Sequence, residues 1–243
     1  MFLPLHDGLA LKHLRRAFAT LLVIAINIFV YVAGTNGLLG DTNRIEIALG
    51  LIPAVLTGDA RISPDLALVP AYTTLITSLF LHAGFFHLAG NKMFLWVFGD
   101  NVEDAMGHVR FLIYYLVCGI CASLVYVYIF PSSRNPLVGA SGAISGVAVA
   151  YLILYPRSRI FGLLLNWIPA YAPSFVMIGL WALYQIYFAV AGGDSSIGWW
   201  AHAGGMISGA LLLPIFRHWQ KPPEVRELSE KENPDEPTAE RPF

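Results

Sequence analysis

Six long apolar segments restrict the fold of this chain more than any other feature. A helix needs about 20 mainly apolar residues to cross the hydrocarbon core of a bilayer. Segments of approximately this length cover residues 17–34, 84–101, 110–130, 139–155, 173–191 and 199–216. Only 13% of the residues are charged, whereas about 25% is usual in soluble domains. The sequence therefore predicts an all-α membrane protein with a bundle of six transmembrane helices.

Basic residues predict how these segments are oriented. Eight basic residues fall on one side of the predicted segments: Lys12, Arg15, Arg16, Arg110, Arg157, Arg159, Arg217 and Lys221. Three fall on the other side: Arg44, Arg61 and Arg134. Because Lys and Arg are enriched in cytoplasmic loops, we expect both termini in the cytoplasm.

The composition divides the chain into three parts. Residues 1–16 are expected to form a cytoplasmic N-terminal segment, residues 17–217 the membrane domain, and residues 218–243 a disordered cytoplasmic tail. The apolar run after Arg16 has no small-residue cleavage site, so we expect it to be retained as the first span.

Two connections between the segments are expected to lie partly at the membrane interface. A long outer loop is expected at about residues 35–72, and loops of this length are usually functional or contain short elements of their own. Its stretches 45–56 and 66–79 are expected to lie partly in the outer leaflet. The connection 156–172 is expected to be a second interfacial piece, with Trp167 in the headgroup zone.

The charge balance and the cysteines restrict the possible partners and cofactors. The formal net charge of −1 argues against nucleic acid as a partner, because such a partner demands a basic face. Cys118 and Cys121 have a CxxC spacing inside an apolar segment, but no further metal ligands lie near them in the sequence and no βαβ pattern surrounds them. We interpret them as small core residues, and we expect no metal and no other cofactor.

Polar side chains lie near the outer ends of the second, fourth and sixth apolar segments. These are His87 and Asn91, then Ser141, then His202. All three segments run from outside to inside in the predicted topology, so these side chains reach the same depth, just below the outer surface. Ionisable residues at membrane depth are functional candidates. We therefore expect one site built from three segments.

Ser141 and His202 are the residue types needed for acyl transfer to serine. A serine hydroxyl becomes a useful nucleophile when a base accepts its proton, which requires His202 within about 3 Å of it. Small residues would allow the two helices to pack this closely: Gly139, Gly142, Gly205 and Gly209. A generic packing seam would explain the glycines, but it would not require His202 in its middle.

His87 and Asn91 are four residues apart and therefore share one face of a helix. Both side chains could donate N–H groups to a developing oxyanion, together with the Ser141 backbone N–H at the start of its helix. The alternative is that they simply hydrogen-bond helices to one another. On their own, these two residues leave both interpretations open.

No carboxylate belongs to this set of residues. Asp194 is the nearest to His202 in sequence and is a weak candidate for orienting the imidazole, so a Ser–His dyad is the preferred interpretation. His82 lies five residues before His87 and is expected to point elsewhere, where it would hold down the loop, although a ligand or orienting role is open.

These motifs together resemble the rhomboid family of intramembrane serine proteases. The resemblance covers about residues 72–216 and rests on His87-Leu-Ala-Gly-Asn91 within 82–104, on Gly139-Ala-Ser-Gly142, and on Ala201-His202-Ala-Gly-Gly205. It implies that Ser141 is the nucleophile and His202 the general base, and that His87, Asn91 and the Ser141 backbone N–H form the oxyanion hole. It also implies transmembrane proteins as substrates, cut at small residues near helix-destabilising ones.

The chain departs from the pattern of this family in two places. The first outer loop contains no Trp, so a Trp–Arg pair seen in many members is missing. Position 145 is Ser, where some members stack an aromatic ring under the histidine. Neither departure removes a catalytic group, so relatives that lack the Ser or the His are a poor match.

The resemblance leads to further expectations about access to the site. Water must reach Ser141 to hydrolyse the acyl-enzyme, and four residues could line its route: Ser132, Ser133, Ser145 and Asn135. Substrate would pass laterally by the fifth segment, where three bulky residues could act as a gate: Phe175, Trp181 and Tyr184. The absence of a transit peptide and the short tail favour a bacterial inner membrane, with the site facing the periplasm or exterior.

Three other functions compete with proteolysis. The first is a non-catalytic rhomboid-like protein that binds membrane proteins or serves in quality control. The second is a proton-coupled transporter with His87 and His202 as relays, but intramembrane carboxylates and paired interrupted helices are missing. The third is a metal site formed by His82, His87 and His202, but the additional Cys, Asp or Glu ligand expected at such a site is missing.

Overall fold

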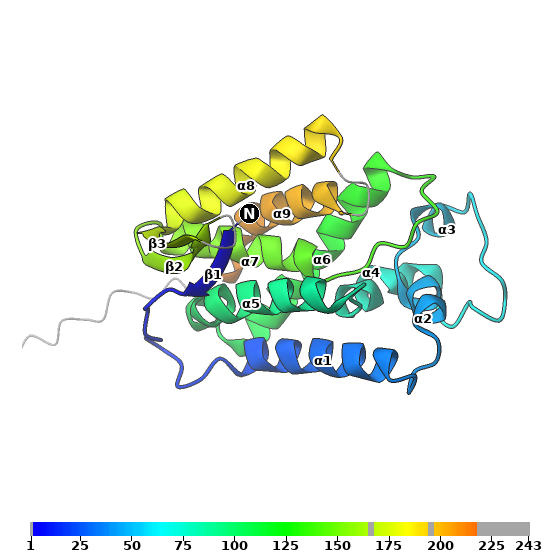
Figure 1. The fold of residues 1–243 in the computed structure, drawn as a ribbon, viewed down its shortest axis with the longest axis horizontal. Helices are drawn as coiled ribbons and strands as arrows, with labels where there is room; N and C mark the ends of the chain where they lie inside the picture. The colour runs from blue at the N-terminus through cyan, green and yellow to red at the C-terminus, as the bar shows by residue number, and fades with distance from the viewer. Residues whose placement is uncertain (1, 165–167, 194–196, 218–243) are drawn as a thin grey trace, which may run out of the picture.

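The computed structural model describes residues 2–164, 168–193 and 197–217, and it is mostly helical (Figure 1). Long helices occupy all six predicted apolar segments: α1 (Phe18–Thr35), α5 (Phe85–Met106), α6 (His108–Ile129), α7 (Ser141–Leu154), α8 (Ser174–Ala191) and α9 (Trp199–Phe216). The long apolar segments therefore located these helices, although α5 continues five residues beyond its predicted end.

Fewer than six of the described helices are long and apolar enough, by themselves, to count as membrane spans. Within the described residues, four helices are long and apolar enough to cross a bilayer: α1, α6, α8 and α9. A bent pair, Ala71–Phe80 followed by α5 at 80°, could form a fifth span, and α7 is a shorter apolar helix. The six-span topology and the orientation of the termini stay predictions.

The long outer loop contains short elements of its own, as its length suggested. These are α2 (Thr42–Leu49), α3 (Pro53–Leu56), η1 (Ala71–Thr73), α4 (Thr74–Thr77) and η2 (Ser78–Phe80). The loop is fastened to the segment before α7, because Leu51 and Leu137 exchange backbone hydrogen bonds of 3.0 and 2.8 Å. It also lines an open, mostly apolar pocket of about 490 Å³.

A small antiparallel sheet corrects the all-α prediction. Strand β1 (Phe2–His6) pairs with β2 (Arg159–Leu164), and β2 pairs with β3 (Ile168–Pro173), giving the order β1-β2-β3. The N-terminal segment and the 156–172 connection are therefore joined in one sheet, a pairing that was not predicted from the sequence. Trp167 lies outside the described residues.

Two carboxylates at the end of α5 fix the N-terminal part of the chain. Glu103 is fully buried and accepts hydrogen bonds from the backbone N–H groups of Ala19 and Thr20, at 2.9 and 2.7 Å. It thus caps the first turn of α1, which has no side-chain cap of its own. Asp104 accepts from the N–H groups of residues 12–14.

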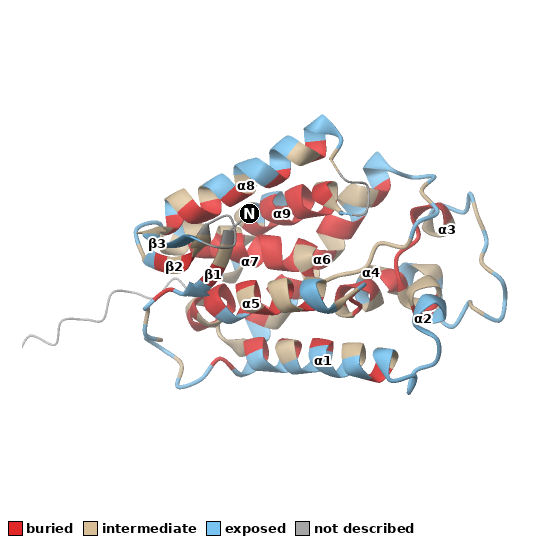
Figure 2. Ribbon diagram, viewed as in Figure 1, coloured by how far each residue is buried: buried red, intermediate tan, exposed pale blue. Residues whose placement is uncertain are grey.

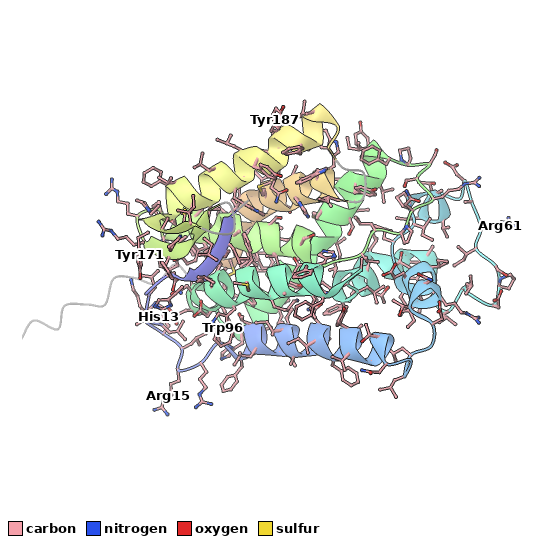
Figure 3. The ribbon with its side chains drawn as sticks, viewed as in Figure 1. His13, Arg15, Arg61, Trp96, Tyr171 and Tyr187 are labelled. Carbon is pink, nitrogen blue, oxygen red and sulfur yellow. The ribbon has the colours of Figure 1, made fainter. Side chains whose placement is uncertain are left out.

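The helices form a buried centre with apolar outer faces. Figure 2 shows α7 and α9 largely buried, while the outward sides of α1 and α8 are exposed. The exposed side chains there are mostly apolar, such as Phe29 on α1 and Leu183 on α8, as expected for surfaces that face lipid. Tyr187 projects from the outer side of α8, and Arg15 and Arg61 lie near opposite ends of the bundle (Figure 3).

Candidate active site

The structure brings Ser141 and His202 into direct contact. The Ser141 hydroxyl oxygen lies 2.8 Å from His202 Nε2, a normal hydrogen-bond distance. Ser141 is the first residue of α7, and His202 lies in the first turn of α9. His202 is buried, whereas Ser141 is partly accessible. This pair therefore has the geometry for proton transfer from the hydroxyl to the imidazole.

Glycines bring α7 and α9 together backbone to backbone. A Cβ atom on Gly205 would overlap the Gly142 carbonyl oxygen, and a Cβ on Gly209 would lie 2.5 Å from the Gly146 Cα. Neither position therefore tolerates a side chain without movement of a helix. Three of these residues were expected in the seam, and Gly146 completes it one turn below Gly142.

Tyr114 of α6 stabilises this helix pair from behind. Its buried hydroxyl lies 3.0 Å from the Gly146 carbonyl oxygen and 2.9 Å from that of Gly209, so it can donate to a carbonyl on either helix. The small residues that allow the close approach thus also expose their carbonyl groups to this hydroxyl. This contact was not predicted from the sequence.

Gly139 places His87 beside Ser141. Its φ of 128° lies in the region that favours glycine. A Cβ there would lie 2.7 Å from His87 Nε2 and 3.7 Å from the Ser141 hydroxyl oxygen, so the imidazole and the hydroxyl border the same small space. The Gly139 N–H donates to the Ser78 carbonyl oxygen at 2.9 Å, which ties this turn to the outer loop.

Asn91 lies one turn after His87 on α5, and its side chain is buried. Its Nδ2 has no hydrogen-bond partner among the described residues. The N-terminus of α7 has no side-chain cap, so its first-turn N–H groups are also available. The four polar residues predicted to form one site are therefore carried by the first two turns of α5, α7 and α9.

His202 has a second polar contact, which was not predicted from the sequence. Its Nδ1 lies 3.1 Å from Gln185 Oε1, and the Gln185 side chain is buried on α8. Gln185 is a polar residue inside an apolar helix, so the criterion that selected Ser141 and His202 could also have found it. Asp194, the weak candidate for this position, lies outside the described residues.

The prediction that the His82 side chain points away from His87 was wrong, whereas its role in holding down the loop stays a prediction. Its ring packs edge-on against the His87 ring, with the centroids 5.2 Å apart. Helical spacing did not apply, because α5 begins only at Phe85 and His82 belongs to the preceding loop. Within the described part of the chain, no three His, Cys, Asp or Glu side chains are grouped so that they could hold a metal ion.

The residues expected to surround the site have different environments. Ser145 is buried and donates to the Ser141 carbonyl oxygen at 2.7 Å, so it is engaged with the α7 backbone rather than lining a water route. Trp181 on α8 packs against Phe94 on α5, with centroids 5.1 Å apart. Tyr184 contacts the ring of Trp199 at 5.9 Å. Aromatic pairs thus link α8 to its neighbours.

Comparison with known proteins agrees with the resemblance. The family model described as the Rhomboid domain matches residues 70–219, more than half of the chain. Similar relatives include the rhomboid protease GluP of Bacillus subtilis, 37% identical over 145 residues, which are 58% of this chain and 26% of that protein. The mitochondrial RHOMBOID-like protein 12 of Arabidopsis thaliana is 27% identical over 160 residues, which are 59% of this chain and 46% of that protein. The chain thus spans less than half the length of these relatives.

Proposed function

Because this chain belongs to the rhomboid family, we propose that it is an intramembrane serine endopeptidase with a Ser141–His202 dyad. The single observation that carries the proposal is the 2.8 Å contact between the Ser141 hydroxyl and His202 Nε2. A buried imidazole and a hydroxyl on neighbouring helices have this arrangement when one activates the other. A packing role would not require it.

In the proposed reaction, His202 Nε2 accepts the hydroxyl proton while Ser141 Oγ attacks the carbonyl carbon of the scissile bond. The C–N bond then breaks, and His202 returns the proton to the leaving amine. The same imidazole next removes a proton from water, whose oxygen attacks the acyl-enzyme, and the proton returns to Ser141 as the acyl group leaves.

The oxyanion formed in each step would be stabilised by the Ser141 backbone N–H, by Asn91 Nδ2 and by His87. The missing partner of Asn91 supports this role. A buried donor without a hydrogen bond costs about 1–3 kcal/mol, and this cost is understandable if the oxygen that satisfies the donor arrives with the substrate. Such donors act most strongly where water is excluded.

The membrane arrangement of the proposed enzyme follows the sequence prediction. Residues 17–217 would form a six-span domain with both termini in the cytoplasm. Residues 218–243, which lie outside the described part of the structure, would form a cytoplasmic tail. Ser141, His87 and His202 lie in the first turns of alternate long helices, which supports one site near the outer surface. The proposed substrates are transmembrane proteins with small residues at the cut.

We place the enzyme in a bacterial inner membrane. The similar relatives include mitochondrial as well as bacterial proteins, and a cell-fractionation experiment distinguishes the two locations. The site would then face the periplasm or exterior.

A fluorophosphonate probe tests the proposed chemistry directly. Purified full-length protein should be labelled covalently, and both Ser141→Ala and His202→Ala should abolish the labelling. Labelling that persists in Ser141→Ala, or a wild type that does not react, would contradict the proposal and favour the non-catalytic binding function. The Gly179→Ala variant is a suitable control, because a Cβ there would meet no atom within 4 Å.

A further inference from the structure

His202 needs a partner on its second nitrogen to act as a base. A neutral imidazole carries one proton, on either Nδ1 or Nε2, and the hydrogen bond at one nitrogen decides which. If the proton were on Nε2, that nitrogen could not accept the Ser141 proton. The reaction therefore depends on a group that holds the proton on Nδ1.

Gln185 is located where such a group is required. Its Oε1 lies 3.1 Å from His202 Nδ1, opposite the nitrogen that contacts Ser141. An amide oxygen can only accept a hydrogen bond, so this contact requires the proton on Nδ1. Nε2 is then unprotonated and faces the hydroxyl. Three side chains on three helices thus form a row of hydrogen-bond contacts: Gln185, His202 and Ser141.

We propose that Gln185 is a positioning residue that fixes the reactive tautomer and ring orientation of His202, so that the site works as a Ser–His–Gln triad. This inference rests on the proposed function and deepens it. Gln185 has the position in the chain of contacts that a carboxylate has in the Ser–His–Asp arrangement.

A neutral acceptor suits this location better than a carboxylate. A charged side chain is costly at membrane depth, whereas an amide carries no net charge. An amide orients the imidazole but stabilises the imidazolium less than a carboxylate would, because it contributes only a dipole. Among the described residues, the titratable side chain that acts electrostatically on His202 is His87 from α5, and the Ser141 hydroxyl from α7 contacts it directly.

Three variants of the full-length protein test the inference. Gln185→Met keeps the length of the side chain but removes the acceptor, and Gln185→Glu keeps the acceptor and adds a charge. Ile186→Met introduces the same methionine at the next position, which is 46% exposed, and serves as the matched control. The measurements are the rate of fluorophosphonate labelling as a function of pH, and kcat and KM for a transmembrane substrate.

Gln185→Met should label about tenfold more slowly, as expected for one lost hydrogen bond of ordinary strength. Its kcat should fall while KM is unchanged, because Gln185 does not touch substrate. Gln185→Glu should recover the rate at high pH, with the midpoint of the acidic limb moved upward by about one pH unit, because a carboxylate favours the protonated imidazole. Ile186→Met should behave as wild type.

The outcomes separate this inference from the proposed function. Wild-type rates for Gln185→Met, or an unmoved pH midpoint for Gln185→Glu, would overturn the role of Gln185 alone, provided that labelling depends on Ser141. A wild type without Ser141-dependent labelling would overturn both. If Gln185→Met fails to fold, as judged by its thermal unfolding, the pH midpoint of Gln185→Glu decides the question.

Discussion

The substitution Gly205→Ala tests whether backbone contact between α7 and α9 sets the distance from Ser141 to His202. At Gly209, a Cβ would lie 2.5 Å from the Gly146 Cα, and ordinary contact begins at 3.4 Å, so relief requires a movement of about 0.9 Å. At Gly205 the Cβ would overlap the Gly142 carbonyl oxygen, which requires at least as large a movement. Both obstructing atoms belong to backbone and cannot turn aside.

The expected loss of activity follows from the position of Gly205, three residues after His202. A separation of α9 from α7 by about 1 Å would lengthen the 2.8 Å contact between the Ser141 hydroxyl and Nε2 beyond hydrogen-bond range. Misplacement of a reacting group by about 1 Å can cost roughly 100-fold in rate. Gly205→Ala should therefore lower the rate of fluorophosphonate labelling about 100-fold, with a smaller loss for Gly209→Ala.

The control for this experiment is Gly179→Ala on α8, where the added Cβ meets no atom within 4 Å. It should retain the wild-type labelling rate. Circular dichroism and thermal unfolding of the detergent-purified proteins show whether each variant is folded. A folded Gly205→Ala protein that labels at the wild-type rate would refute the argument, because α7 and α9 could then separate without affecting the dyad.

Three further substitutions test three different properties of the protein: transition-state stabilisation, substrate access and stability. Asn91→Ala should lower kcat by about 100- to 1000-fold, as for other oxyanion donors, with an unchanged unfolding temperature, because Nδ2 has no partner in the described structure; an unchanged kcat would exclude it from the oxyanion hole. Trp181→Ala removes the contact with Phe94 between α8 and α5 and should speed cleavage of an embedded substrate without changing fluorophosphonate labelling; equal cleavage rates would argue against a gate at this place. Glu103→Ala leaves two N–H groups of α1 without their acceptor and should destabilise the protein by about 2 kcal/mol or more, seen as a lower unfolding temperature; an unchanged temperature would mean that other groups cap α1.

Much of the helical framework could be predicted because membrane helices have a strong local signal. The apolar runs located the six long helices, with most ends within two residues of the prediction. Polar residues are rare in such runs, so Ser141, His87 and His202 were conspicuous. Because alternate segments run in the same direction, these three residues were expected at one end of the helix bundle. These inferences needed only local composition and the alternation of direction.

The small sheet could not be predicted in the same way. Strand β1 pairs with β2 across more than 150 residues, and the apolar run of β2 is too short to distinguish strand from helix by pattern. Gln185 and His82 illustrate a second limit, since their contacts with His202 and His87 depend on how helices and loops pack. Sequence spacing gives no partner across such a contact.

The packing around His202 is different on its two sides, and this difference bears on how a substrate could reach Ser141. On the α7 side, glycines place the backbone of one helix against that of the other. The two helices therefore cannot approach further, and separating them would lose these contacts. On the α8 side, the contacts of α9 are made by side chains: Gln185 with His202, and Tyr184 with Trp199. Side chains can change rotamer or yield, whereas touching backbones cannot. Opening for a transmembrane segment is therefore expected beside α8. The backbone contacts keep α7 and α9 together while α8 moves, and the Gln185 contact that orients His202 must re-form when α8 closes.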